Sequence, residues 1–130
     1  MAIANRKVIL PCDVQRAWSI VTSLENYAWR SDIRRIERIS ETQFVEHTKA
    51  GYATTFTITA TVPLVRWEFD MENENMKGHW TGLFSEHGGA TTVVLTEEVA
   101  AKKIWLKPFV KGYLKKQQSL YIADLEKALK

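Results

Sequence analysis

Glu97 is the residue of this sequence whose type and position best suit it to chemistry. It follows the strand alternation of Val93, Leu95 and Val99, which places its carboxyl group on an apolar face, while Glu98 falls on the opposite face. Burial raises the pKa of a carboxyl group, so Glu97 could orient a polar group of a ligand or act as a general acid or base. Alternatively, this side chain near a strand end simply reaches solvent.

A second catalytic group is not evident from the sequence. The other polar residues expected to face inward are Thr54, Tyr113 and Gln117, and none of them is a convincing base. The three histidines are expected at outward positions or beside turns: His47, His79 and His87. With one cysteine and no zinc motif, phosphate loop or nucleophile elbow, we expect no metal and no cofactor. Whether the protein is an enzyme stays open.

Aromatic residues dominate the positions expected to face the interior. They supply more ring surface than a core of this size obviously needs, so we expect a cavity for a small hydrophobic molecule; the alternative is that the rings fill the space themselves. The inward aromatic set is Tyr52, Phe56, Trp67, Phe69, Trp80, Phe84, Phe109 and Tyr113. Tyr27 and Trp29 are expected at the mouth, where they either gate access or plug the open end. Glu97, Tyr113 and Gln117 would orient polar groups of the ligand.

Lysines form the strongest basic cluster of the chain. Lys103, Lys107, Lys111 and Lys115 recur every four residues, with Lys102 and Lys116 beside them. Positive charge near a helix N-terminus opposes the helix dipole, which would suit an anionic ligand head or a membrane surface, although a solvated helix face is the simpler interpretation. Nucleic-acid binding is not expected, because the aromatic residues fall inward rather than between these lysines.

Strands and helices must position these residues. Alternation predicts strands over residues 3–10, 33–39, 43–48, 52–62, 65–74, 77–86 and 90–100. A helix is expected from Val14, capped by Asp13, and a second short helical segment over residues 24–29. Pro108 suits the first turn of a long final helix. The expected inward stripe of that helix is Phe109, Val110, Tyr113, Leu114, Gln117, Leu120, Tyr121, Leu125 and Ala128.

The strand over residues 77–86 predicts the shape of the sheet. Gly78 and Gly82 alternate with Trp80 and Phe84 on its inward face, and glycine lets a strand bend and leaves room above it. We therefore expect an α+β fold in which a curved, mostly antiparallel sheet wraps around the C-terminal helix.

Length and composition indicate a folded protein with a single domain over residues 1–130. The chain has 130 residues and a net charge of +3, a small excess that does not by itself favour a polyanionic partner. No apolar run reaches the roughly 18 residues of a membrane span, so integral membrane association is not expected. Asn5, Arg6 and Lys7 interrupt the apolar residues near the start, where a signal peptide would need an apolar core, so we expect a cytoplasmic protein. The oligomeric state is not determined by the sequence.

Two segments carry a resemblance to a known superfamily. Residues 8–18 (VILPCDVQRAW) and residues 24–29 (LENYAW) resemble the opening strand and helices of the START-like superfamily, also called SRPBCC. The resemblance covers nearly the whole chain and is nearest to the bacterial polyketide cyclase/dehydrase and lipid-transport branch. It implies the helix-grip fold and a hydrophobic molecule bound between sheet and helix, with catalysis in only some branches. Ser40-Glu41-Thr42 stands where the plant pathogenesis-related branch has a glycine-rich loop.

Three functional hypotheses follow. The first is binding or carrying of a small hydrophobic ligand, lipid-like or polyketide-like, in the cavity. The second is a polyketide cyclase or dehydratase that uses the same cavity and Glu97. The third is a module that binds a partner or a membrane surface through the lysine face.

Overall fold

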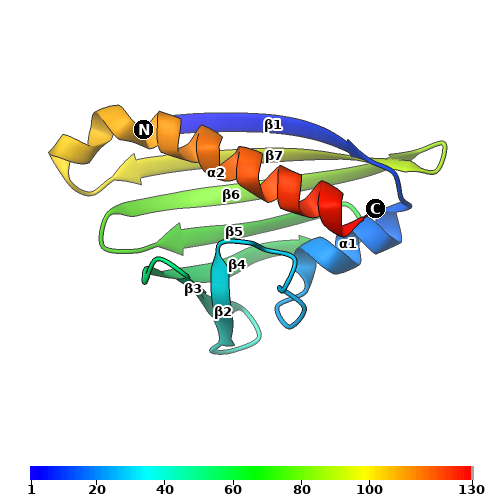
Figure 1. Ribbon diagram of the computed structural model, residues 1–130, viewed down its shortest axis with the longest axis horizontal. Coiled ribbons are helices and arrows are strands. Elements are labelled where there is room, and N and C mark those ends of the chain that lie inside the picture. Colours follow the sequence, from blue (N-terminus) through cyan, green and yellow to red (C-terminus); the bar gives the residue numbers. More distant parts are fainter. Residues whose placement is uncertain (130) are drawn as a thin grey trace.

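The computed structural model describes residues 1–129 and shows one seven-stranded antiparallel sheet curved around a long helix (Figure 1). The strand order is β1-β7-β6-β5-β4-β3-β2. In chain order the elements are β1 (Ala2–Leu10), α1 (Val14–Thr22), β2 (Ile33–Arg38), β3 (Gln43–Thr48), β4 (Ala53–Val62), β5 (Arg66–Glu72), β6 (Met76–His87), β7 (Ala90–Ala101), the 3-10 helix η1 (Ile104–Leu106) and α2 (Lys107–Ala128). This is the helix-grip arrangement expected from the sequence.

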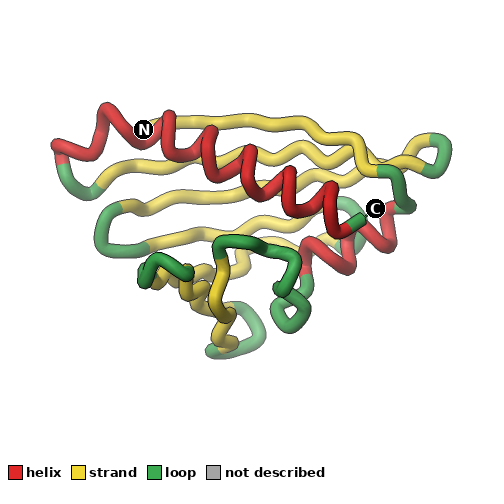
Figure 2. The backbone as a smooth tube through the Cα atoms, in the orientation of Figure 1, coloured by secondary structure: helices red, strands yellow, loops and turns green. Residues whose placement is uncertain are grey.

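The long helix lies nearer to one edge of the sheet than to the other. In Figure 2 α2 runs obliquely in front of the strands and ends close to α1. Its sheet contacts are to β1 and β7, where Val110 and Leu114 pack with Ala4 and Val99. The helix therefore packs mainly on the edge of the sheet that β1 and β7 form.

Alternating burial in the strands follows the alternating sequence. In β5, Trp67 and Phe69 are buried, whereas Arg66 and Asp70 are exposed. Successive side chains of a strand point to opposite faces, so one face of this sheet forms the core and the other meets solvent.

Gly82 allows β6 to carry a large ring on its inner face. A Cβ atom added at Gly82 would lie 2.6 Å from Cη2 of Trp80, so the indole ring lies directly over the glycine. Any larger residue at this position would displace the ring. Glycine was expected to leave space above a bent strand, and at Gly82 the ring of Trp80 occupies this space.

The segment after β1 contains one helix rather than the predicted two. Asp13 caps α1 as expected, since its carboxylate accepts a hydrogen bond of 2.8 Å from the backbone N–H of Arg16. Residues 23–32 contain turns instead of the predicted helical segment over residues 24–29. The Ser23 hydroxyl accepts from the backbone N–H of Asn26, as an N-cap would, but no helix follows it.

The inward stripe of α2 differs in part from the predicted one. Pro108 lies in the first turn as expected. Phe109 and Leu120, predicted to face inward, are 69% and 37% exposed, while Gln118 and Ile122 are buried. The buried row advances four residues at a time from Val110, so Phe109, about 100° away around the helix, points outward. Within residues 1–129 no helix combines the length and apolar character needed to cross a membrane.

Candidate ligand-binding site

A cavity of about 170 Å³ lies between the sheet and α2. One wall consists of aromatic rings from β3 to β6: Phe44, Phe56, Trp67, Phe69 and Trp80. The rings of Phe69 and Trp80 stack at 4.7 Å, and those of Phe44 and Phe56 stack at 5.0 Å. The rings therefore contact one another as a core would, and together they also form a continuous apolar wall.

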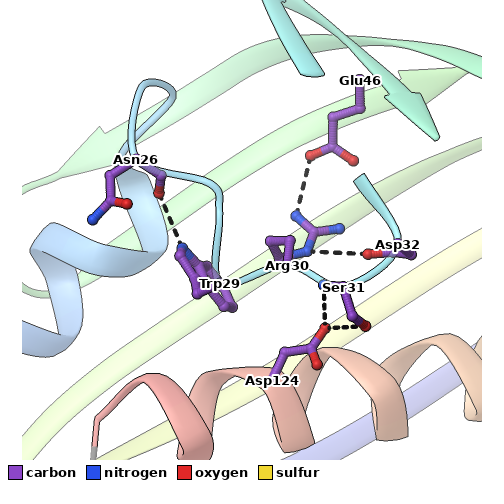
Figure 3. A network of polar contacts seen from close by, with 7 residues as sticks. All are labelled: Asn26, Trp29, Arg30, Ser31, Asp32, Glu46 and Asp124. Atoms are coloured by element: carbon purple, nitrogen blue, oxygen red, sulfur yellow. Dashed lines mark hydrogen bonds and ion pairs between the residues drawn. The ribbon is translucent and has the colours of Figure 1, made fainter. Parts of the chain in front are cut away.

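Charged side chains also line the cavity, gathered around Arg30 (Figure 3). Its Nη1 lies 3.3 Å from Oε2 of Glu46, and its Nε lies 3.6 Å from Oδ1 of Asp32. The guanidinium group also lies over the ring of Tyr121, 4.9 Å from the centroid. Only 15% of each of the Arg30 and Glu46 side chains is exposed, so this ion pair is largely buried.

Burial and ion pairing shift the pKa values of Arg30 and Glu46 in opposite directions. Burial tends to lower the pKa of Arg30, but Glu46, Tyr121 and Asp32 outweigh it and hold that pKa above its usual value. Burial raises the pKa of Glu46, and the adjacent Arg30 offsets this only in part. Arg30 is thus firmly cationic, and two carboxyl groups already share its charge.

The loop that carries Arg30 is attached to α2. The backbone N–H and the hydroxyl of Ser31 both donate to Oδ2 of Asp124 at 2.8 Å (Figure 3). Trp29 packs edge-on against Tyr121, with centroids 5.4 Å apart, and its indole N–H donates to the carbonyl of Asn26. These contacts place the guanidinium group in the space between sheet and helix.

Glu97 enters the cavity from β7. Burial raises its pKa to about 7, while Gln118 and Arg30 lower it and Glu46 raises it further. Within residues 1–129 Glu97 forms no ion pair. The carboxyl group can therefore donate a hydrogen bond when protonated and accept one when ionised, and it changes between these states near neutral pH.

Two buried polar atoms of the cavity lining have no hydrogen-bond partner within residues 1–129: Nε of Arg30 and Oε1 of Gln118. The amide nitrogen of Gln118 is satisfied, because it donates to the carbonyl of Ala4 at 3.0 Å. An unpaired buried polar atom costs about 1–3 kcal/mol, which native proteins rarely leave uncompensated. The polar side of the cavity is therefore able to make further hydrogen bonds.

The structure places most of the predicted ligand-binding residues in the lining of this cavity. They are Tyr27, Trp29, Phe56, Trp67, Phe69, Trp80, Glu97, Tyr113 and Gln117. Their part in binding stays a prediction. Glu97 is half-buried and burial is the main cause of its raised pKa, which favours the inward position over the alternative in which this carboxyl simply reaches solvent.

Three predicted residues lie elsewhere. Tyr52 is 63% exposed, because β4 begins at Ala53 and the alternation does not extend to the preceding turn. Phe84 is buried but packs edge-on against Trp18 of α1, with ring centroids 5.1 Å apart. Phe109 lies on the outer side of α2, as described above.

Sequence reasoning missed Arg30, Glu46 and Gln118. It placed Tyr121 in the inward stripe of the final helix but did not assign it to the cavity. Glu46 could have been found, because it alternates with the buried Phe44 along β3. Gln118 could have been found from the four-residue spacing after Val110 and Leu114. Arg30 follows no periodic pattern, since a loop positions it.

The histidines lie outside the cavity lining. His79 lies on the outer face of the sheet, where its Nδ1 and Nε2 are each 2.7 Å from a carboxylate oxygen, of Asp70 and Glu68 respectively. Burial tends to lower the pKa of His79, but these two carboxylates raise it overall. Within the described residues no group of histidine, cysteine and acidic side chains is arranged to hold a metal ion.

The lysine cluster divides into two parts. Lys102 pairs with Glu72, and Nζ of Lys103 donates to Oδ1 of Asn75 at 3.0 Å. The remaining lysines of the cluster are exposed along α2: Lys107, Lys111, Lys115 and Lys116.

Comparison with known proteins assigns the family. The sequence profile of the family described as polyketide cyclase/dehydrase and lipid transport matches residues 1–130. The chain belongs to this family. It is therefore a START-like protein, as the resemblance of its first strand and helix predicts. No curated protein matches this family member significantly in sequence.

Solved structures share the fold of this START-like protein. A START superfamily protein from Mycobacterium smegmatis is 13% identical, with a TM-score of 0.90 over 99% of this chain and 97% of that one. A conserved protein from Geobacillus kaustophilus is 12% identical, with a TM-score of 0.84 over 98% of this chain and 94% of that one. DynU16, from the dynemicin biosynthetic locus, is 14% identical, with a TM-score of 0.76 over 99% of this chain and 47% of that one. At these identities the likeness shows the fold alone.

Proposed function

We propose that this family member binds or carries a small hydrophobic molecule in the cavity between the sheet and α2. The observation that carries the proposal is a cavity whose lining combines aromatic rings with residues that hold unpaired buried polar atoms. Apolar area supplies affinity, and a few placed polar groups fix orientation in sites of this kind. We also propose that residues 1–130 act as one domain in the cytoplasm.

Two tryptophan variants test this proposal. Gln117→Trp introduces a large ring at a residue that lines the cavity, and Lys116→Trp introduces the same ring at the exposed neighbouring position. We expect native mass spectrometry to detect a hydrophobic ligand on the unmodified protein and on Lys116→Trp, and to detect none on Gln117→Trp. A protein that copurifies with no ligand, or a Gln117→Trp variant that retains it fully, would contradict the proposal.

A cyclase or dehydratase is the second candidate function, and Glu46 favours it. Sequence analysis found Glu97 without a partner, but the cavity holds a second carboxyl group with a raised pKa. In a dehydration, one of the two would remove the proton beside a carbonyl group and the other would protonate the departing hydroxyl group.

Turnover of a linear poly-β-keto thioester, followed by the ultraviolet absorbance of the aromatic product, tests the enzyme candidate. We expect Glu97→Gln and Glu46→Gln each to lower kcat at least a hundredfold, with Glu98→Gln as the outward-facing control. Activity that survives both cavity substitutions would assign the chemistry to other groups, and no turnover by the unmodified protein would remove this candidate.

The surface where α2 begins favours a third candidate, peripheral binding to an anionic membrane. Ile104, Trp105 and Phe109 are 75%, 66% and 69% exposed. A group of large exposed apolar side chains usually marks an interaction site. Lys107 and Lys111 stand among them, and the first turn of α2 holds no acidic residue. Tryptophan and lysine together suit the boundary of an anionic bilayer, whereas a second copy of this surface would bring like charges together.

Flotation with vesicles tests the membrane candidate. We expect cosedimentation or flotation with phosphatidylserine–phosphatidylcholine vesicles that salt weakens, and little binding to phosphatidylcholine alone. The double variant Trp105→Ser with Phe109→Ser should lose binding, while Ile9→Ser, at a 62% exposed apolar residue of β1, should keep it. Equal binding by both variants would contradict this candidate, as would binding to neither kind of vesicle.

A further inference from the structure

The size of the cavity limits its ligand. Its volume is about 170 Å³. A buried apolar cavity of about 150 Å³ is known to hold one benzene molecule, whereas pockets for drug-sized ligands run to roughly 300–1,000 Å³. The space therefore accommodates one ring with short substituents, and it is too small to enclose a two-chain lipid or a multi-ring polyketide.

The wall of the cavity favours an aromatic ring over an aliphatic chain. Phe69 already makes stacked contact with Trp80 and edge-on contacts with Phe56 and Trp67, at 5.0 Å and 5.3 Å respectively. All four of these residues line the cavity, and a further ring could pack against them in a stacked or an edge-on arrangement.

The unpaired polar atoms define the substituent of that ring. Nε of Arg30 is a donor that needs an acceptor, and Oε1 of Gln118 is an acceptor that needs a donor. All three residues line the cavity, where Gln118 and Arg30 both lower the pKa of Glu97. A hydroxyl group both accepts and donates a hydrogen bond, whereas a methyl group does neither and a carboxylate only accepts.

Charge excludes an acidic ligand. Asp32, Glu46 and Glu97 line the cavity together with a single buried cation, Arg30. Glu72 also lines it, but Glu72 is paired with Lys102. Glu46 and Asp32 already balance the charge of Arg30. A ligand carboxylate could accept a hydrogen bond from Nε of Arg30, but its negative charge would meet no unpaired cation. In a poorly solvated site such repulsion is only weakly screened.

From this geometry we infer that the ligand is a neutral single-ring aromatic molecule with a hydroxyl group, and that the cavity discriminates against aromatic carboxylates. The inference rests on the proposed binding function and adds the chemical class of the ligand.

Three probes of matched shape test the inference: toluene, 4-methylphenol and 4-methylbenzoate, titrated at pH 7.5 by calorimetry or by protein NMR. We expect 4-methylphenol to bind at least about tenfold more tightly than 4-methylbenzoate, a difference of about 1.4 kcal/mol, and more tightly than toluene. If 4-methylbenzoate binds as tightly as 4-methylphenol, the charge argument is wrong. Equal binding of toluene and 4-methylphenol would show that no hydroxyl group is recognised.

Variants separate this inference from the proposed function. Glu97→Gln removes one negative charge and should narrow the preference for 4-methylphenol over 4-methylbenzoate at least about threefold, while Glu98→Gln should leave it unchanged. An unchanged preference in Glu97→Gln would overturn the charge argument. Should no probe bind while a larger hydrophobic molecule copurifies with the unmodified protein, the inference fails and the proposed function stands. The inference and the proposed function both fail if no probe binds and no hydrophobic molecule copurifies with the protein.

Discussion

Replacing Glu97 by glutamine should stabilise the protein, and more so at higher pH. Burial raises the pKa of Glu97 from its usual value of 4.5 to about 7. Between these two values the native protein keeps a proton that the unfolded chain has already released. The free energy of unfolding therefore falls as pH rises through this window, and the loss is complete above about pH 7. Glutamine has nearly the same shape and no charge, so it avoids this loss.

The size of the effect follows from the two pKa values. The full difference corresponds to about 3 kcal/mol, and partial exposure of the side chain brings the expected figure to about 2 kcal/mol. Because the loss is small at pH 5, the stability advantage of Glu97→Gln should grow by about 2 kcal/mol between pH 5 and pH 8. Removing this charge also makes ionisation of the nearby Glu46 easier, which acts in the same direction.

Urea denaturation at pH 5 and pH 8 measures this change, with the tryptophan fluorescence as the signal. Glu98→Gln is the matched control, because the neighbouring side chain is exposed. Its stability relative to the unmodified protein should be nearly independent of pH. A constant difference between Glu97→Gln and the unmodified protein at both pH values would refute a buried, unpaired carboxyl group at this position.

Three further substitutions test other contacts. Gly82→Ala should lower the free energy of unfolding by about 1–3 kcal/mol, because its Cβ would lie 2.6 Å from the Trp80 ring; a neutral result in denaturation would show that the ring moves freely. Asp13→Ala should cost about 1 kcal/mol through loss of the helix cap, whereas Asp13→Asn should cost much less; equal losses in thermal unfolding would argue against a capping role. Arg30→Met should cost about 3–5 kcal/mol by leaving Glu46 buried and uncompensated, and the added change Glu46→Gln should restore part of this; a double-mutant cycle without coupling would mean that the pair is solvated.

Alternation predicted the sheet well because each strand has one buried and one exposed face. The predicted strand over residues 43–48 coincides with β3, and the inward positions of Trp67 and Phe69 were read correctly from β5. The same rule failed at Tyr52, one residue before β4, where a turn replaces the strand. Periodicity is therefore reliable within an element and unreliable at its ends.

The long helix shows a second limit of prediction from the sequence. Its extent and its proline in the first turn were predicted, but the rotation that points Phe109 outward was not. Apolar residues lie on more than one side of α2, so their spacing alone does not say which side meets the sheet. Contact with β1 and β7 decides it, and that contact is not a local property of the sequence.

By itself, the sequence determined the order of the strands along the chain and the family, and it made Glu97 the candidate for an inward carboxyl group, because each depends on local periodicity or on motifs. Only the tertiary structure decided which charged groups share the cavity. Arg30 arrives from a loop that Asp124 attaches to α2, and Glu46 arrives from β3. These residues are distant in sequence, and long-range packing sets both their separation and their exclusion from solvent. The raised pKa of Glu97 and the balance of charge around the cavity therefore depend on the whole fold rather than on any one segment.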